Sequence, residues 1–130
     1  MPFNLSDKSI LVVDDSPIMR MFLVMNMRRM MRVNITEAVN GKDAITKLMN
    51  GKFDLLLTDM NMPEMGGAEL VRFVRNGLKS DIPIVIITTR GESHDRDLGM
   101  QLGANSYLTK PVDVTKLIKT ILTCLEKYSF

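Results

Sequence analysis

Five short apolar segments, separated by stretches with helical periodicity, constrain the fold more than any other feature of this sequence. Three of them consist almost entirely of Val, Ile and Leu, a composition typical of strands that are covered on both faces of a parallel sheet. The predicted strands are 9–13 (SILVV), 33–38 (VNITEA), 53–58 (FDLLLT), 82–88 (IPIVIIT) and 106–109 (SYLT).

Each of these segments is followed by a stretch whose apolar residues recur at the spacing of one helix face. Ser16 is placed to cap the first helix, with Pro17 at its first position, and Gly77 is placed to end the third. The predicted helices cover residues 17–32, 41–49, 68–76 and 93–102, and a fifth begins after Asp113.

The alternation of strand and helix predicts an α/β fold in which right-handed crossovers build a parallel sheet with helices on both faces. Five strands suit the flavodoxin-like (βα)5 doubly wound fold, with strand order 2-1-3-4-5. A length of 130 residues is typical of one domain. We therefore expect residues 1–130 to form a single domain, without a separate output domain.

The composition argues against several classes of function. The 17 basic residues nearly balance the 15 acidic ones, for a net charge of +2, which gives no support to nucleic acid as a main partner. No apolar run approaches the ~18 residues of a membrane span, and the chain start lacks the apolar core of a signal peptide. The single cysteine, Cys124, excludes an internal disulfide. We expect a cytoplasmic protein that neither binds nucleic acid nor inserts into a membrane.

Polar side chains follow four of the five predicted strands. Asp14 and Asp15 come directly after the first strand, and Asp59 follows the third. Thr88 ends the fourth strand, and Lys110 follows the fifth. Because ligands of open α/β sheets bind beyond the carboxyl ends of the strands, we expect these side chains to converge there.

Three carboxylates in one patch repel each other, and their charged forms need more positive charge than one lysine supplies. Mg²⁺ fits this need, since it binds carboxylates and phosphate oxygens, whereas zinc or copper would call for His or Cys ligands. A metal ion, Lys110 and Thr88 together suit a dianionic phosphoryl group. A carboxylate can accept that group directly as an acyl phosphate.

Four segments together resemble the receiver domains of bacterial response regulators, most closely the CheY-like single-domain regulators of chemotaxis. The segments are ILVVDDSPIMR, LLLTDMNMPEMGG, IPIVIITTRG and GANSYLTKP, in this order and at the predicted strand ends. The resemblance extends from about Lys8 to Leu125 and implies a phosphorylated signalling switch of a two-component system rather than a classical enzyme.

The resemblance assigns roles to the residues at the strand ends. Asp59 is implied as the phosphoacceptor. The side chains of Asp15 and Asp59 and the backbone carbonyl of Asn61 are implied to bind Mg²⁺, for which Mn²⁺ is a possible substitute, while Asp14 acts partly through water. Thr88 and Lys110 are implied to contact the phosphoryl oxygens.

Two further residues take roles from the resemblance. Tyr107 matches an aromatic that swings between exposed and buried positions, although a fixed, half-buried aromatic is the alternative. Pro111 matches a cis-proline that follows the lysine. The sequence departs from the family pattern at Val112, where Phe is common, and at Thr89, where Ala is common. Position 90 is Arg, where the CheY-like regulators carry an acidic residue.

The resemblance also implies partners. A histidine kinase or a histidine phosphotransfer domain would be the phosphodonor. A downstream protein would bind the face formed by the fourth helix, fifth strand and fifth helix of a monomer. In the family, the end of the first helix near the site helps to dock the phosphodonor, and this helix is rich in methionine, which both fills cores and forms adaptable surfaces. Six methionines fall in this stretch: Met19, Met21, Met25, Met27, Met30 and Met31.

Two other functions compete with a chemotaxis effector. A phosphorelay shuttle, which passes the phosphoryl group to another histidine, would use the same residues. An aspartate-dependent phosphatase for small molecules resembles an Asp-x-Asp pattern after the first strand, whereas here Asp14 and Asp15 are adjacent. The best candidate nucleophile, Asp59, follows the third strand instead, which disfavours this second alternative.

Overall fold

In the computed structural model, which describes residues 3–89 and 91–127, five strands alternate with five α-helices as the sequence predicts. No helix within these ranges is long and apolar enough to cross a bilayer. The strands are β1 (Phe3–Val13), β2 (Met31–Ala38), β3 (Leu55–Asp59), β4 (Ile84–Thr89) and β5 (Ser106–Lys110). The helices are α1 (Pro17–Met30), α2 (Gly41–Asn50), α3 (Gly67–Arg72), α4 (Ser93–Leu102) and α5 (Val114–Lys127).

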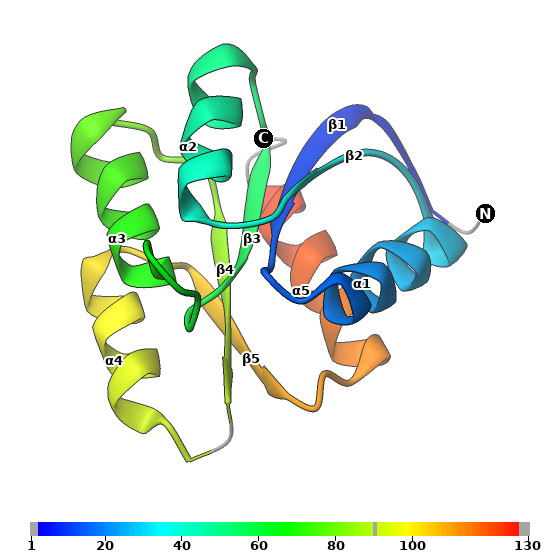
Figure 1. Ribbon diagram of the computed structural model, residues 1–130. Helices are drawn as coiled ribbons and strands as arrows, with labels where there is room; N and C mark the ends of the chain where they lie inside the picture. Colours follow the sequence, from blue (N-terminus) through cyan, green and yellow to red (C-terminus); the bar gives the residue numbers. More distant parts are fainter. Residues whose placement is uncertain (1–2, 90, 128–130) are drawn as a thin grey trace.

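All strand pairs are parallel, and their order is β2-β1-β3-β4-β5. Helices α1 and α5 cover one face of this sheet, and α2, α3 and α4 cover the other (Figure 1). The predicted flavodoxin-like fold is therefore confirmed.

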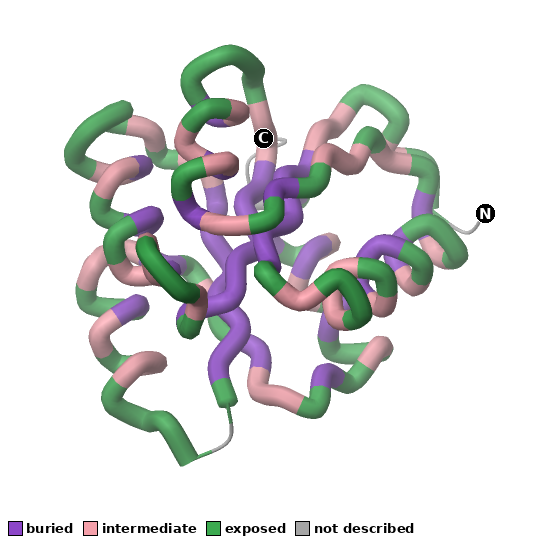
Figure 2. The backbone as a smooth tube through the Cα atoms, in the orientation of Figure 1, coloured by how far each residue is buried: buried purple, intermediate pink, exposed green. Residues whose placement is uncertain are grey.

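The sheet separates two hydrophobic cores, because successive side chains of a strand point to opposite faces. Ile10 and Val12 belong to the core under α1 and α5, whereas Leu11 and Val13 belong to the core under α2, α3 and α4. Figure 2 shows the central strands as the most buried part of the chain. Burial on both faces explains the nearly continuous Val, Ile and Leu composition of these strands.

The boundary between the first helix and the second strand differs from the prediction. The helix ends at Met30 rather than at residue 32, since Met31 already belongs to β2 and its side chain is buried in the core. β1 begins at Phe3 rather than at residue 9, and Phe3 pairs with Met31. Residues 3–5 pair with β2 and the register shifts before Ser9, and because residues 3–8 carry few apolar side chains, this part of β1 left no strand pattern in the sequence.

The third helix also departs from regular geometry. It begins at Gly67, and a π-helical turn, Phe73–Gly77, continues α3 to the predicted end at Gly77. The Leu78 N–H donates to the Phe73 carbonyl at 2.9 Å, which closes the wider turn.

β3 and β4 each start two residues later than predicted and end one residue later, so Asp59 is the last residue of β3.

The methionines of the first helical stretch divide between the two expected roles. Those on the inner side fill the core, and those on the outer side lie in solvent. Met27 and Met31 are buried, Met19 and Met30 are half-buried, and Met21 and Met25 are exposed.

Candidate functional site

Three carboxylates meet at the carboxyl ends of β1 and β3. Val13 pairs with Thr58 in the parallel register of these strands, so the residues that follow, Asp14 and Asp59, are neighbours. One oxygen from each of Asp14, Asp15 and Asp59 lies within 4.8 Å of the other two. Asp14 and Asp59 are buried, whereas Asp15 is exposed. The structure thus brings the three carboxylates together at the edge where the sequence placed them.

Asp14 has one satisfied and one unsatisfied oxygen. Its Oδ1 accepts the Ser16 N–H at 2.9 Å, but its buried Oδ2 has no hydrogen-bond partner among the described residues. Burial raises the pKa of Asp14, the Ser16 N–H opposes this shift, and the Asp59 carboxylate adds to it. A buried oxygen without a donor is rare, and here it suits a cation held between the carboxylates. The carboxylate oxygens of the cluster suit Mg²⁺, which prefers oxygen ligands.

Asp59 lies between Lys110 and the loop that follows β3. The Lys110 ammonium is 3.3 Å from Asp59 Oδ2, and the Asn61 N–H donates to Oδ1 at 3.3 Å. Burial raises the pKa of Asp59, while the charge of Lys110 lowers it. The Lys110–Pro111 peptide bond is cis, as the resemblance implies. One ammonium group thus faces a buried carboxylate in a cluster of three.

Thr88 and Tyr107 lie on adjacent strands but in different environments. Thr88 is buried at the end of β4 and pairs with Thr109, two residues beyond Tyr107. The Tyr107 side chain is in the outward position, 41% exposed. The guanidinium carbon of Arg96, on α4, lies 5.2 Å from the centre of the Tyr107 ring. A hollow of about 480 Å³ is lined by Thr88, Thr89, Gly91, Glu92, Ser93, Arg96, Thr109 and Lys116.

Arg20 and Glu92 also contact residues of the site, although the sequence analysis did not identify either of them as a site residue. The Arg20 guanidinium donates to the Asp14 carbonyl at 2.7 Å and pairs with Glu37 at 3.2 Å, which fixes the turn that carries the carboxylates. Glu92 accepts a hydrogen bond from the Asn61 side chain. The Arg20–Glu37 and Asn61–Glu92 contacts join residues 17 and 31 positions apart, so no local pattern indicates them. Arg90, which departs from the family pattern, lies outside the described residues.

Gly67 allows α3 to begin directly against Asp59. A Cβ at this position would lie 2.6 Å from the Asp59 carbonyl oxygen and 2.8 Å from the Met60 Cα. Both neighbours are backbone atoms, which cannot move aside easily. The second glycine of the MPEMGG segment is therefore required for close packing rather than for an unusual backbone angle.

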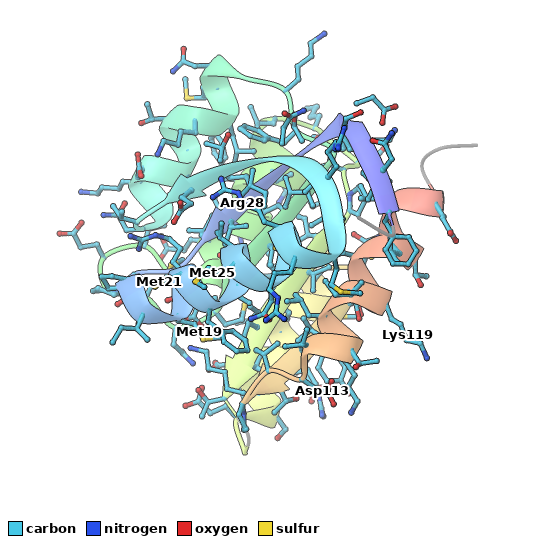
Figure 3. All side chains as sticks on the ribbon, turned by 90° about the vertical axis from the view of Figure 1, so that its right-hand side faces the viewer. Met19, Met21, Met25, Arg28, Asp113 and Lys119 are labelled. Atoms are coloured by element: carbon cyan, nitrogen blue, oxygen red, sulfur yellow. The ribbon has the colours of Figure 1, made fainter. Side chains whose placement is uncertain are left out.

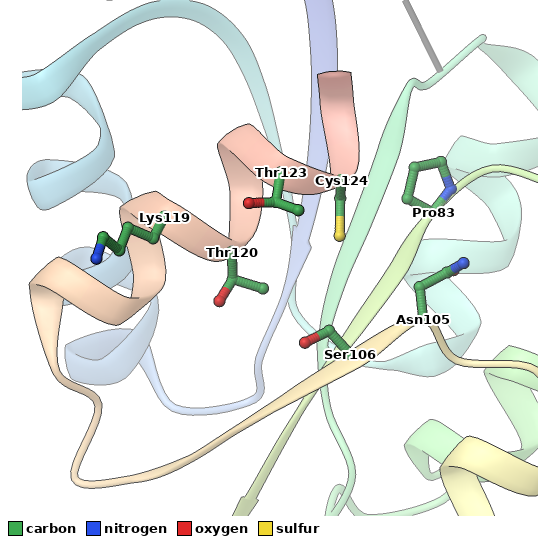
Figure 4. A pocket seen from close by; sticks show the side chains of 7 residues that line it. All are labelled: Pro83, Asn105, Ser106, Lys119, Thr120, Thr123 and Cys124. Atoms are coloured by element: carbon green, nitrogen blue, oxygen red, sulfur yellow. The ribbon is translucent and has the colours of Figure 1, made fainter. Parts of the chain in front are cut away.

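A separate cavity of about 250 Å³ lies at the opposite end of β5, between the start of that strand and α5 (Figure 4). Among the described residues that line it, none is a carboxylate and only Lys119 is charged, which separates this cavity from the acidic cluster. Its lining residues are Pro83, Asn105, Ser106, Lys119, Thr120, Thr123 and Cys124.

A doubly wound sheet with three carboxylates and a lysine at its strand ends is the arrangement expected of a receiver-type signalling domain. The chain matches the response regulator receiver domain family over residues 10–122, and it belongs to this family. Receiver domains are signalling switches that interact with histidine kinases and downstream targets and generally bind Mg²⁺ at an acidic pocket.

Relatives of full receiver length support this assignment. The chain is 37% identical to protein PilH of Pseudomonas aeruginosa, over 86% of this chain and 93% of PilH. It is 39% identical to chemotaxis protein CheY1 of Helicobacter pylori, over 78% of this chain and 84% of CheY1. The solved structure of chemotaxis response regulator CheY4 of Vibrio cholerae superposes with a TM-score of 0.82 at 30% identity, and 91% of this chain and 98% of CheY4 are covered.

Replacing Asp14 by Asn should stabilise the metal-free protein. Because its pKa is raised, folded Asp14 keeps its proton to a higher pH than unfolded Asp14. The free energy of unfolding therefore falls as the pH rises through this window, and the loss is complete above both pKa values. Asp14→Asn removes the charge and keeps the acceptor for Ser16. We expect a gain on the order of 1 kcal/mol in urea unfolding at pH 8 with a chelator.

The gain should shrink below the ordinary carboxyl pKa of 3.8, where the Asp14 carboxyl is protonated in both states. Asp54→Asn is the matched control, because its Oδ2 also accepts a backbone N–H, from Ser9 at 2.8 Å, at the other end of the sheet. Equal or lower stability of Asp14→Asn at pH 8 would contradict this account of the cluster.

Proposed function

We propose that residues 1–130 act as one phosphoacceptor receiver domain of a two-component system, in which Asp59 takes a phosphoryl group from a histidine donor. The observation that carries this proposal is the contact of a buried carboxylate, Asp59, with the Lys110 ammonium inside a cluster of three carboxylates. The cluster concentrates the groups that phosphoryl transfer needs, which are a nucleophile and positive charge beside it.

The residues divide the chemistry among them. An Asp59 oxygen forms a bond to phosphorus while the bond from phosphorus to the histidine nitrogen breaks, so the phosphoryl group moves without an added reactant. Asp15, Asp59 and the Asn61 carbonyl would hold Mg²⁺, with Asp14 acting partly through water, and the ion would neutralise charge on the phosphoryl oxygens. Lys110 pairs with Asp59 in the structure and would turn to a phosphoryl oxygen after transfer.

The output would be a shape change at the face of α4, β5 and α5. A phosphoryl oxygen is a strong acceptor, so the Thr88 hydroxyl would turn toward it. The Tyr107 side chain would then enter the hollow that Thr88 and Arg96 line, which changes the face offered to a downstream protein. The exposure of Tyr107, at 41%, supports this proposal, since the switch would require an outward side chain in the resting state.

We place this output in chemotaxis, because CheY1 and CheY4 are chemotaxis proteins by name. The alternative is a shuttle that passes the phosphoryl group to a histidine phosphotransfer protein in a relay. Pull-down of partners with and without a phosphoryl mimic distinguishes the effector from the shuttle. An effector should capture, in the presence of the mimic, a protein that neither donates nor accepts phosphoryl groups. A shuttle should capture only phosphodonors and phosphoacceptors. We expect the chain to act as a cytoplasmic monomer in either case.

The outer side of α1 is the surface we propose for the phosphodonor. Met19, Met21, Met25 and Arg28 lie along this helix on the side of the molecule that faces the viewer in Figure 3. Ile18, Met21 and Met25 are 81%, 58% and 55% exposed. Exposed apolar side chains that form one patch often mark a protein–protein interaction surface. This patch begins with Ile18, three residues after Asp15.

Phosphorylation at Asp59 is tested by mass. Incubation with acetyl phosphate and Mg²⁺ should add one phosphoryl group to the unmodified chain and none to Asp59→Asn, because the amide cannot form an acyl phosphate. Asp54→Asn serves as the control for the substitution itself and should be labelled like the unmodified chain. Labelling of Asp59→Asn at the normal rate would disprove the assignment.

Phosphodonor docking is tested by changing the exposed methionines. Met21→Lys and Met25→Lys should each slow phosphotransfer from a histidine kinase that phosphorylates the unmodified chain, by about five- to tenfold. Labelling by acetyl phosphate, which needs no docking surface, should stay unchanged. Met49→Lys is the matched control, because Met49 is 65% exposed but lies on α2. Equal slowing by all three substitutions would contradict a specific surface on α1.

The switch is tested by the beryllofluoride mimic of the phosphoryl group. In its presence, NMR should show new side-chain rotamers for both Thr88 and Tyr107, with reduced solvent exposure of the Tyr107 ring. Asp59→Asn, which cannot hold the mimic, should keep the resting spectrum. If both rotamers stay the same while affinity for a downstream partner rises, the signal does not pass through these residues.

A further inference from the structure

One side-chain hydrogen bond joins the loop that carries the acceptor site to the start of α4. The Asn61 Nδ2 donates to the Glu92 Oε2 at 2.5 Å, across 31 residues of sequence. The backbone N–H of the same Asn61 donates to Asp59 Oδ1 at 3.3 Å. Asn61 therefore contacts the acceptor through its backbone and Glu92 through its side chain. The second contact is charge-assisted, a class of hydrogen bond that is stronger than a neutral one.

Glu92 is held by its backbone in a way that leaves its carboxylate available. It is the residue directly before α4, yet its side chain makes no capping hydrogen bond to the helix. Its N–H donates to the Thr89 carbonyl at 3.1 Å, and its carbonyl accepts the Arg96 N–H at 3.3 Å. The carboxylate thus extends from a fixed backbone position toward Asn61 instead of toward its own helix.

The loop between β3 and α3 has local reasons to need such a contact. Glu64 has a φ of 69°, a left-handed conformation that costs a non-glycine residue roughly 1–3 kcal/mol. Asn61 is exposed, so burial does not hold its side chain in place. At its far end the loop is fixed by Gly67, whose N–H donates to the Met60 carbonyl at 3.0 Å. The hydrogen bond to Glu92 fixes the near end.

We propose that Glu92 is a positioning residue for the phosphoryl-transfer site, acting through the side chain of Asn61. By holding Asn61, the carboxylate keeps the N–H of this residue on Asp59 and keeps its carbonyl in place for Mg²⁺. This inference rests on the proposed function. The hydrogen bond between Asn61 and Glu92 also links the acceptor loop directly to the start of α4. Glu92 lines the same hollow as Thr88 and Arg96.

The charge of Glu92 offers a competing explanation, since any carboxylate near the cluster attracts a cation. The two explanations differ for glutamine at position 92. Glu92→Gln loses the charge but keeps an oxygen that can accept from Asn61, whereas Glu92→Ala loses both. Glu64→Gln is the matched control for charge, because Glu64 is an exposed carboxylate of the same loop that pairs with Lys42 at 3.9 Å and not with Asn61.

The experiment measures Mg²⁺ affinity by NMR titration together with the side-chain amide signals of Asn61. In the metal-free protein, Glu92→Ala should shift the Asn61 side-chain amide signals, whereas Glu64→Gln should leave them unchanged. Glu92→Ala should weaken Mg²⁺ binding by about two- to fivefold, the range of an exposed charge-assisted pair. Glu92→Gln should stay close to the unmodified chain. In an Asn61→Ala background, Glu92→Ala should have no further effect.

Other outcomes overturn the inference. Equal weakening by Glu92→Gln and Glu92→Ala would leave only the effect of charge, and so would a full effect of Glu92→Ala in the Asn61→Ala background. Unchanged Mg²⁺ affinity in Glu92→Ala would overturn the positioning role while the proposed function stands. An unmodified chain that binds no Mg²⁺ and accepts no phosphoryl group would instead overturn the proposed function, and this inference with it.

Discussion

Burial of two neighbouring carboxylates is the costly interaction on which the acidic end of the molecule depends. Asp14 and Asp59 are removed from water beside each other, and burial raises the pKa of both. Water would solvate these groups better than the protein does, so they remain in place only because the strands that carry them are fixed by two hydrophobic cores. Residues 10–13 of β1 and residues 55–57 of β3, which are apolar and buried on both faces of the sheet, supply that rigidity.

The buried carboxylates of this site are only partly paired with positive charge and hydrogen-bond donors, which distinguishes the site from a structural ion pair. Lys110 faces Asp59, Ser16 donates to one oxygen of Asp14, and the second oxygen of Asp14 has no partner among the described residues. A site built only for stability would satisfy every buried oxygen. The unsatisfied oxygen of Asp14 therefore suits a cation, and the perturbed carboxyl groups around it are of the kind that gathers at functional sites.

The sequence predicts this arrangement well where local pattern determines it. The order of strands follows from buried apolar segments, and the meeting of Asp14, Asp15 and Asp59 follows from parallel strands whose carboxyl ends share one edge. The early end of α1 and the extended start of β1 were not predicted, because pairing between residues 3–5 and β2 depends on contacts across the chain. The partners of Asn61 and Tyr107 are also tertiary. Glu92 directly precedes α4 and Arg96 lies in its first turn, and although the sequence predicts this helix, local periodicity does not indicate which distant residues its side chains contact.

The contact between Arg96 and Tyr107 is too weak to lock the proposed switch, and this weakness is consistent with its role. A cation–π contact at a partly exposed site contributes roughly 0.5–1 kcal/mol. A nearly complete change from 1:99 to 99:1 requires a difference of about 5.5 kcal/mol. New hydrogen bonds from Thr88 and Lys110 to a charged phosphoryl group, at roughly 1.5–3 kcal/mol each, approach that difference. In the proposed switch, the phosphoryl contacts of Thr88 and Lys110 would therefore supply most of the difference, and the contact of Arg96 with Tyr107 would only adjust the balance between the two states.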